Sequence, residues 1–262
     1  FQAITCMAEM RKLQHMTTEP DVVDANVSSA PTRSTAAPWT TPATTAVLVL
    51  ADGTVIEGQG AGAKGAAVAE ICFNTAITGY QEILTDPSYA GQIVTFTYPH
   101  QGNVGTNRFD SESERPQAAG LVVRELSRIT SNWRSESSLD EWLAEAGIIG
   151  IEGVDTRLLV RTIRKEGAMR CVIASGNATS GDLVERARAI PRMTGLNLVD
   201  RVTTETSYDF APRDESGYRL ETSTVGAPPF HVVVLDFGVK RNLLERLAAH
   251  GCRLTVLPAS ST

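Results

Sequence analysis

The C-terminal end of this 262-residue chain places the strongest limit on its fold. The apolar run 231–235 is followed by the turn-like 236–238, a helical pattern at 239–250 and a second apolar run at 253–257. This order predicts a βαβ unit whose first strand is buried on both faces. Two parallel strands leave one face and both edges of a sheet open, so such a unit is stable only within a larger sheet. We therefore expect residues 230–262 to begin an open α/β domain.

A larger patterned region covers residues 46–200, with strand patterns first and alternating helices and strands afterwards. Strands are expected at 46–51, 54–57, 70–74, 92–98, 148–151 and 169–174. Helices are expected at 79–84, at 139–146 after the Ser138/Glu141 capping box, at 155–164 after Asp155, and after a cap at Ser180. Asp52-Gly53 predicts a hairpin with a type I′ turn, in which both residues have positive φ. The pattern indicates a mixed domain of strands and helices.

Two segments lack the pattern of a folded core. Residues 1–45 are rich in Thr, Ala, Ser and Pro without a helical or strand period, so we expect a disordered leader. The chain begins with Phe1, and translation from Met16 is an alternative start. Residues 201–229 are polar and contain several Pro and Gly, which predicts an interdomain connection.

Charge and cysteine content exclude several functional classes. The chain has 24 Lys and Arg against 30 Asp and Glu, and its net charge of -6 argues against nucleic-acid or anionic-membrane partners. Its longest apolar run, 46–51, is far shorter than the roughly 18 residues of a membrane span. The four Cys form no CxxC pair, so we expect no metal site and no redox motif. Scattered thiols in a chain of this length favour a reducing, cytoplasmic location.

No side-chain group has the setting of a catalytic centre. Cys72 and Cys171 fall in apolar strand patterns, as expected of small buried hydrophobes. His100 lies in a turn, and the glycine-rich run 102–107 lacks the Lys-Ser/Thr of a phosphate-binding loop, so a tight loop is its expected role. The residues alone therefore predict a noncatalytic region that precedes an α/β domain.

Four motifs carry a specific resemblance to a known family. The runs 73–89 and 92–107, together with Asp155-Thr-Arg157 and 236–242, resemble the small, glutamine-amidotransferase subunit of carbamoyl-phosphate synthase over about residues 46–262. The resemblance implies the α/β class. A swivelling β/β/α domain at 46–200 would be followed by the first βαβ unit of a flavodoxin-like class I amidotransferase domain.

The resemblance also implies an activity. Glutamine would be hydrolysed through a Cys thioester, and the ammonia would pass to a large subunit that binds ATP and Mg²⁺ and makes carbamoyl phosphate for pyrimidine and arginine synthesis. The family's catalytic Cys, His and Glu fall downstream of Thr262, so no catalytic residue and no cofactor are expected here, and the chain alone is expected to be inactive. Ser88 matches a serine that contacts L-glutamine. The alternatives are a noncatalytic docking module for the large subunit, and an amidotransferase chain of another synthetase.

Overall fold

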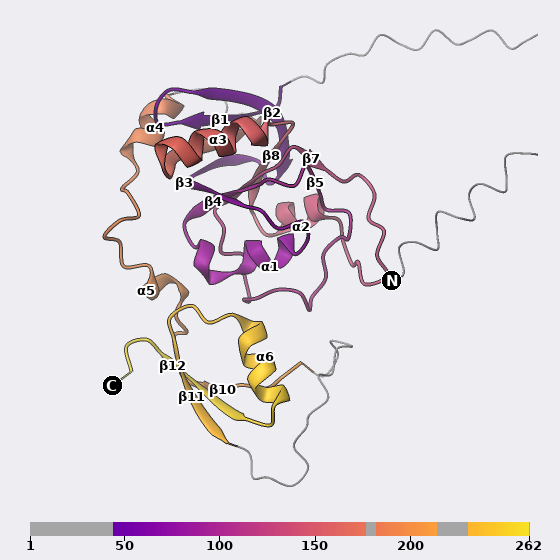
Figure 1. Ribbon diagram of the computed structural model, residues 1–262, viewed down its shortest axis with the longest axis vertical. Coiled ribbons are helices and arrows are strands. Elements are labelled where there is room, and N and C mark those ends of the chain that lie inside the picture. The colour runs from indigo at the N-terminus through magenta and orange to yellow at the C-terminus, as the bar shows by residue number, and fades with distance from the viewer. Residues whose placement is uncertain (1–43, 177–181, 214–229, 262) are drawn as a thin grey trace, which may run out of the picture. The chain divides into compact units, whose positions relative to one another are not determined.

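The computed structural model describes residues 44–176, 182–213 and 230–261 (Figure 1). The leader expected at 1–45 lies almost entirely outside these residues, and so does Ser180, the expected cap of the fourth helix. None of the helices within the described ranges is long and apolar enough to span a bilayer.

Seven strands close into a barrel in the order β1-β2-β8-β6-β4-β3-β9. They are β1 (Ala46–Leu50), β2 (Val55–Gly62), β3 (Gly65–Asn74), β4 (Gln92–Phe96), β6 (Gly120–Val122), β8 (Ile149–Glu152) and β9 (Met169–Ser175). The mixed α/β class expected from the sequence is confirmed. The arrangement differs from the expected β/β/α domain because β9 pairs antiparallel with both β1 and β3, which joins the two ends of the sheet.

Apolar side chains at alternate positions along the strands fill the interior of the barrel. Leu48 and Ile71 from the first half of the chain pack with Ile93, Ile151 and Ile173, and all five are fully buried. Burying each such side chain contributes about 1.5–3 kcal/mol. The core therefore depends on residues from five strands that are far apart in the sequence.

The hairpin between β1 and β2 forms, but its turn differs from the expected type I′. Gly53 has φ of 100°, whereas no residue other than glycine has positive φ within the described ranges, so Asp52 does not. The amide of Leu50 donates to the carbonyl of Thr54 at 2.9 Å, and the amide of Gly53 donates to the carbonyl of Leu50 at 3.0 Å. The loop thus has three residues, with one glycine in the positive-φ position that a type I turn and bulge requires.

The expected helices are present and pack on the outside of the barrel. α1 (Tyr80–Thr85), α2 (Leu139–Glu145), α3 (Thr156–Glu166) and α4 (Leu183–Ala189) all begin within a few residues of their predicted starts. Ser138 and Glu141 form the complete capping box at α2, whereas the side chain of Asp182 caps α4. α2 packs on β2, and α4 packs on β9 and β1 (Figure 1).

Shorter elements connect these parts. They are the 3₁₀ turn η1 (Pro87–Tyr89), the paired strands β5 (His100–Gln101) and β7 (Glu125–Leu126), and the helix α5 (Val199–Val202).

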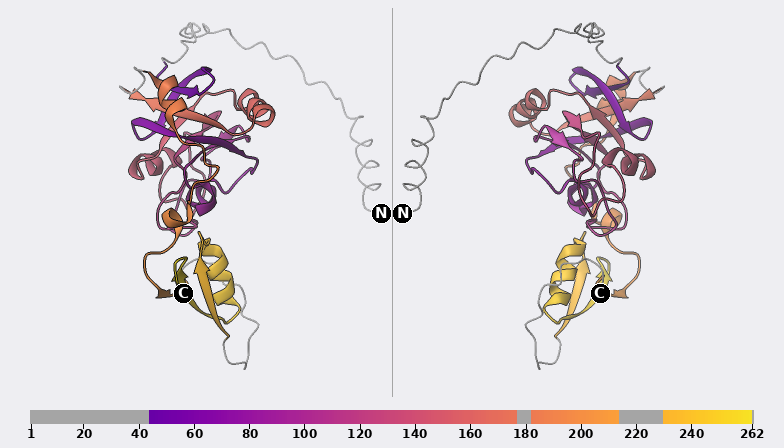
Figure 2. Two further views of the ribbon diagram at one scale, coloured as in Figure 1. Left: turned by 90° about the vertical axis from the view of Figure 1, so that its left-hand side faces the viewer. Right: turned by 90° about the vertical axis from the view of Figure 1, so that its right-hand side faces the viewer.

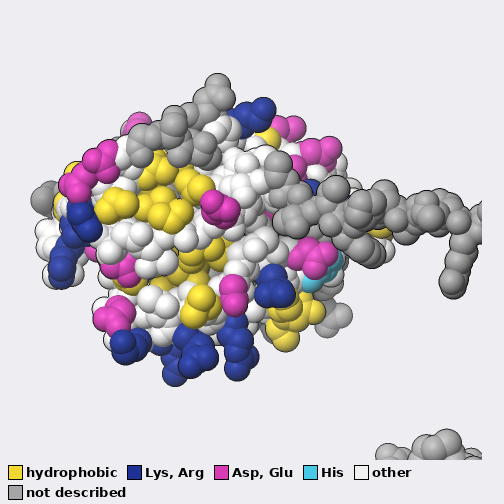
Figure 3. All heavy atoms as spheres, turned by 90° about the horizontal axis from the view of Figure 1, so that it is seen from above, with side chains coloured by type: hydrophobic (Ala, Val, Ile, Leu, Met, Phe, Trp, Pro, Cys, Tyr) yellow, Lys and Arg dark blue, Asp and Glu magenta, His cyan; other side chains and the backbone are white. Residues whose placement is uncertain are grey.

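The outer side of α3 is basic, since Arg157, Arg161 and Arg164 are all exposed. Seen from above, the molecule shows Lys and Arg side chains in a row along one edge (Figure 3).

The C-terminal residues form the expected βαβ unit. β11 (His231–Asp236) and β12 (Arg253–Pro258) are parallel, and α6 (Arg241–Ala249) connects them and lies along one face (Figure 2). β10 (Tyr208–Asp209), from the segment expected as a connection, pairs antiparallel with the outer edge of β12. Within the described residues α6 covers one face of β11, so burial of the other face within a larger sheet stays a prediction. Val233 and Leu235 on the other face are 54% and 47% exposed.

Candidate functional site

Ser88, the one predicted binding residue, lies in η1 directly after α1. Asp86 is the N-cap of this turn, and its Oδ1 accepts a hydrogen bond from the amide of Ser88 at 2.9 Å. Pro87 is buried, whereas Ser88 is exposed. The buried cap and the proline therefore fix the backbone and leave the Ser88 side chain accessible, as a binding residue requires.

The carboxylate that caps this turn also contacts the βαβ unit. Lys240, directly before α6, places its Nζ 2.6 Å from Oδ2 of Asp86. The hydrogen bond to Asp86 raises the pKa of Lys240 and outweighs the opposite effect of desolvation. Asp86 itself is buried, so the ion pair satisfies a charge that would otherwise be costly to desolvate. The pair joins two sequence motifs, 73–89 and 236–242, that lie far apart in the chain.

The turn after β11 packs against the same place. The buried carboxylate of Asp236 accepts hydrogen bonds from the amides of Gly238 at 2.9 Å and Val239 at 2.8 Å, and from the amide of Thr204 at 2.7 Å. Gly238 has φ of +96°, and a Cβ there would lie 3.0 Å from Cβ of Pro87. A side chain at this position would be strained and would push against the residue next to Ser88. Glycine thus allows the turn to approach η1.

Glu112 provides a second connection, by capping α6 from outside the βαβ unit. The amide of Arg241 donates to the Glu112 carbonyl at 2.9 Å, and the amide of Asn242 donates to Glu112 Oε2 at 2.8 Å. The amide of Glu112 in turn donates to Thr85 Oγ1, in the last turn of α1, at 2.8 Å. Lys240, the N-cap residue, makes no side-chain cap of its own. The backbone carbonyl and the carboxylate of one residue from the barrel region therefore each satisfy a first-turn amide that has no partner within the helix.

The glycine-rich run 102–107, expected to be a tight loop, is hydrogen-bonded to α1. The Tyr80 hydroxyl donates to the Gly105 carbonyl at 2.6 Å, and the side chain of buried Gln81 bonds both the amide and the carbonyl of Asn107. The amides of Gly105 and Thr106 also donate to carbonyl groups of the protein. The amides of residues 105–107 are therefore occupied within the protein.

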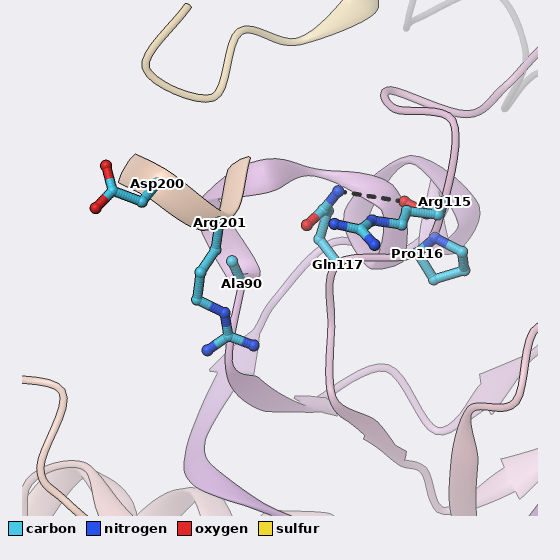
Figure 4. A pocket seen from close by; sticks show the side chains of 6 residues that line it. All are labelled: Ala90, Arg115, Pro116, Gln117, Asp200 and Arg201. Atoms are coloured by element: carbon cyan, nitrogen blue, oxygen red, sulfur yellow. Dashed lines mark hydrogen bonds between the residues drawn. The ribbon is translucent and has the colours of Figure 1, made fainter. Parts of the chain in front are cut away.

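A cavity of about 340 Å³ lies beside η1, between the barrel and α5 (Figure 4). Its lining residues are Ala90, Arg115, Pro116, Gln117, Asp200 and Arg201. Figure 4 shows Gln117 lying toward Arg115, with its Nε2 3.5 Å from the Arg115 carbonyl, whereas Asp200 points away from both. Ser88 is not among the lining residues, so this cavity and the Ser88 surface are separate features.

The described cysteines and histidines do not assemble a nucleophilic centre. Burial raises the pKa of Cys72 to about 11 and raises that of fully buried Cys171 further. His100 lies near Glu125, with 3.8 Å between Nδ1 and Oε1, and Nε2 of His231 lies 2.9 Å from Thr255 Oγ1. Within the described ranges, no three His, Cys, Asp or Glu side chains could together hold a metal ion.

The resemblance singled out Ser88, whose role stays a prediction, but the sequence did not indicate the residues that hold its turn. Asp86 lies in the 73–89 motif and Lys240 in the 236–242 motif, so the sequence did mark both residues as parts of family motifs. Glu112 gave no such signal, because it lies in an acidic run that is typical of a solvated loop. Its capping role depends on a helix more than a hundred residues away, as the separation of Glu112 and Asn242 shows.

Comparison with known proteins identifies the region around this site. The model of the CPSase domain of the carbamoyl-phosphate synthase small chain matches residues 48–173. The protein named carbamoyl phosphate synthase small chain from Parasynechococcus marenigrum is 49% identical over 214 residues, which are 82% of this chain and 56% of that protein. Its namesake from Pseudomonas aeruginosa is 49% identical over 222 residues, with coverages of 82% and 58%.

A third relative of the same name, from Synechocystis sp., is 50% identical over 219 residues, which are 83% of this chain and 57% of the relative. The chain thus spans less than two thirds of the length of these relatives. The family model covers nearly all of the barrel, from within β1 to within β9, and it includes the 73–89 motif around Ser88. Residues 48–173 therefore match the CPSase domain of the carbamoyl-phosphate synthase small chain, and the chain is similar to proteins of that name over about four fifths of its length.

Proposed function

We propose that this chain is part of the glutamine-hydrolysing small subunit of a carbamoyl-phosphate synthase. The observation that carries the proposal is the junction at Ser88, where the 73–89 motif and the 236–242 motif meet through Asp86 and Lys240. An exposed hydroxyl, held by a buried cap at a junction between two structural units, is well placed to hydrogen-bond a polar amino acid. Ser88 would thus bind L-glutamine.

The wider reaction follows from the family. The small subunit would release ammonia from glutamine, and a large subunit would use that ammonia with bicarbonate and ATP to make carbamoyl phosphate. ATP and Mg²⁺ would be bound by the large subunit, and this chain would bind no cofactor. The heterodimer would serve pyrimidine and arginine synthesis in the cytoplasm. Residues 230–262 would begin a flavodoxin-like amidotransferase domain.

The hydrolytic step requires a thiolate nucleophile activated by a base. Cys72 and Cys171 are poor candidates because burial raises the pKa of both. Following the family's motif pattern, we propose that the catalytic Cys, His and Glu lie outside this 262-residue sequence, and that the sequence alone does not hydrolyse glutamine. This supports a binding and docking role for the barrel region, and a noncatalytic docking module for the large subunit is the second candidate.

Reconstitution tests the proposal. The complete small chain containing this sequence is combined with the large chain of the same organism, and carbamoyl phosphate is measured with glutamine or with ammonium as nitrogen donor. We expect glutamine to serve as donor only when the small chain is present, and ammonium to serve with or without it. Failure to support synthesis from glutamine, in a preparation that is active with ammonium, would refute the proposal.

A further inference from the structure

The short segment 110–113 is hydrogen-bonded both to α1 of the barrel region and to α6 of the βαβ unit. On the barrel side, the amide of Glu112 donates to Thr85 Oγ1, in the last residue of α1, at 2.8 Å. On the other side, the carbonyl and the carboxylate of Glu112 accept the amides of Arg241 and Asn242, at 2.9 and 2.8 Å. Glu112 thus connects the end of α1 to the start of α6, and we call this set of contacts the Glu112 bridge.

The barrel side of the bridge is anchored by the neighbouring residues of the segment. The hydroxyl of Ser111 accepts from Nε2 of buried Gln81 at 2.9 Å, and the hydroxyl of Ser113 donates to the last carbonyl of α1. Oδ1 of Asp110 lies 2.7 Å from the guanidinium of Arg134. The segment is thus fixed to the barrel region, and the bridging carboxylate is a preorganised acceptor for the start of α6.

The bridge runs beside the junction that holds Ser88. Thr85, at one end of the bridge, directly precedes Asp86, whose carboxylate accepts the amide of Ser88. Arg241, at the other end, directly follows Lys240, which pairs with that same carboxylate. The βαβ unit is therefore joined to the turn of Ser88 twice, at neighbouring positions, through Asp86 and through the bridge.

The start of α6 depends on an acceptor from outside the helix. Lys240 is its N-cap residue, and the side chain of Lys240 caps no amide of α6. The carboxylate of Glu112 accepts one of these first-turn amides, and a negative charge is favourable at this end of a helix. Glu114, two positions further in the same acidic run, is exposed and takes part in none of these contacts.

We propose that Glu112 is a positioning residue for the glutamine site, which holds Ser88 in register with the unit that begins at β11. This inference rests on the proposed function, because it takes Ser88 as a contact of L-glutamine and the βαβ unit as the start of the amidotransferase domain. A substrate bound between groups of two units is held well only when both are positioned before it binds, so loss of the bridging carboxylate raises the KM for glutamine. Synthesis from ammonium, which bypasses glutamine, does not depend on the bridge.

The test measures the KM for glutamine in the complete small chain containing this sequence, assembled with its large chain. Glu112→Ala is expected to raise this KM about five-fold, as the loss of one hydrogen bond would. Glu112→Gln keeps an oxygen that can accept the amide of Asn242, so it changes KM less than about two-fold. Glu114→Ala is the matched control and leaves KM unchanged. The kcat with glutamine and the rate with ammonium are expected to stay at the parent values in all three variants.

A second substitution keeps the charge but shortens its reach. Glu112→Asp withdraws the carboxylate by one methylene from the amide of Asn242, so it is expected to raise the KM for glutamine about three-fold or more. Thermal melting shows whether each variant is folded, and Glu112→Asp carries the test where Glu112→Ala is not.

A double variant separates positioning of Ser88 from a general loosening of the fold. In the Ser88→Ala background, Glu112→Ala is expected to raise KM less than about two-fold further, because the hydroxyl that it positions is gone. An unchanged KM in folded Glu112→Ala overturns the inference and leaves the proposed function standing. Equal increases in both backgrounds, or an equal loss with ammonium, also overturn it. A parent assembly that uses ammonium but not glutamine refutes the proposed function instead.

Discussion

Lys240 donates a hydrogen bond of 2.6 Å to the buried carboxylate of Asp86, and the other oxygen of that carboxylate holds the amide of Ser88. One side chain thus fixes the 3₁₀ turn of the barrel region and contacts the βαβ unit. The turn that carries Ser88 is therefore linked through Asp86 to the contact between the barrel region and the βαβ unit.

Removing the charge of Asp86 is expected to weaken the fold. Asp86→Asn keeps an oxygen that can cap the turn but loses the charge that Lys240 pairs with, so we expect the free energy of unfolding to fall by about 1–2 kcal/mol. Urea denaturation measures the change. Lys165→Met is the control, because Lys165 pairs with Glu166 on the exposed side of α3 and such pairs contribute little. A loss no larger than that of the control would contradict the structural role of the pair.

The same pair predicts a pH dependence. The pKa of Lys240 is raised by its hydrogen bond to Asp86, so the pair stabilises the fold fully below the ordinary lysine pKa and loses its effect as pH rises through the raised value. The stability difference between the parent and Lys240→Met is thus expected to be constant from neutral pH to about pH 10, and to shrink at higher pH. Urea denaturation at several pH values measures it. A difference that shrinks between pH 7 and pH 9 would be inconsistent with this origin.

Crowding at Gly238 can be separated from backbone strain. Gly53 and Gly238 have similar φ, +100° and +96°, but a Cβ at Gly53 meets no atom within 4 Å, whereas one at Gly238 lies 3.0 Å from atoms of Pro87 and Val202. We expect Gly53→Ala to cost about 1 kcal/mol for positive φ. Gly238→Ala is expected to cost about 1–2 kcal/mol more because of overpacking. Equal losses in urea denaturation would show that the turn does not press on Pro87.

The buried thiols are expected to be unreactive in the folded chain. Burial raises the pKa of Cys72 to about 11, so on the order of 0.1% of it is thiolate at pH 8. Cys171 is fully buried and its pKa is raised further. Iodoacetamide labelling followed by peptide mass mapping should find both unmodified in the native chain and modified in urea. Partly exposed Cys252 is the internal comparison. Rapid native labelling of Cys72 would contradict the packing described here.

The sequence predicted those parts of the fold that depend on local interactions. The capping box at Ser138 and Glu141 and the cap at Asp155 are made within a few residues, and both helices begin where they were expected. The closed barrel was not predicted, because closure depends on β9 pairing with both β1 and β3, and no local pattern reports a pairing between Ser175 and Ala46. Long-range registers of this kind are set by the whole sheet.

The same contrast holds for the site. Ser88 could be singled out because a specific motif surrounds it, and Gly238 because glycine in a turn has a local signature. The capping of α6 by Glu112 could not be predicted, since it requires two segments to meet that no periodicity connects. The apolar run of β11 indicates which residues can be buried, but it does not indicate whether a second layer of the described structure covers them.

The proposed role of Ser88 makes one measurement decisive. In the complete small chain assembled with its large chain, Ser88→Ala is expected to raise the KM for glutamine about five-fold, because one hydrogen bond to the substrate contributes about 1 kcal/mol. Ser88→Thr keeps the hydroxyl and should change KM less, and Ser207→Ala, at another exposed serine, should leave it unchanged. Synthesis from ammonium is expected to be unaffected in all three. An unchanged glutamine KM in Ser88→Ala, or an equal loss with ammonium, would contradict the placement of Ser88 in the glutamine site.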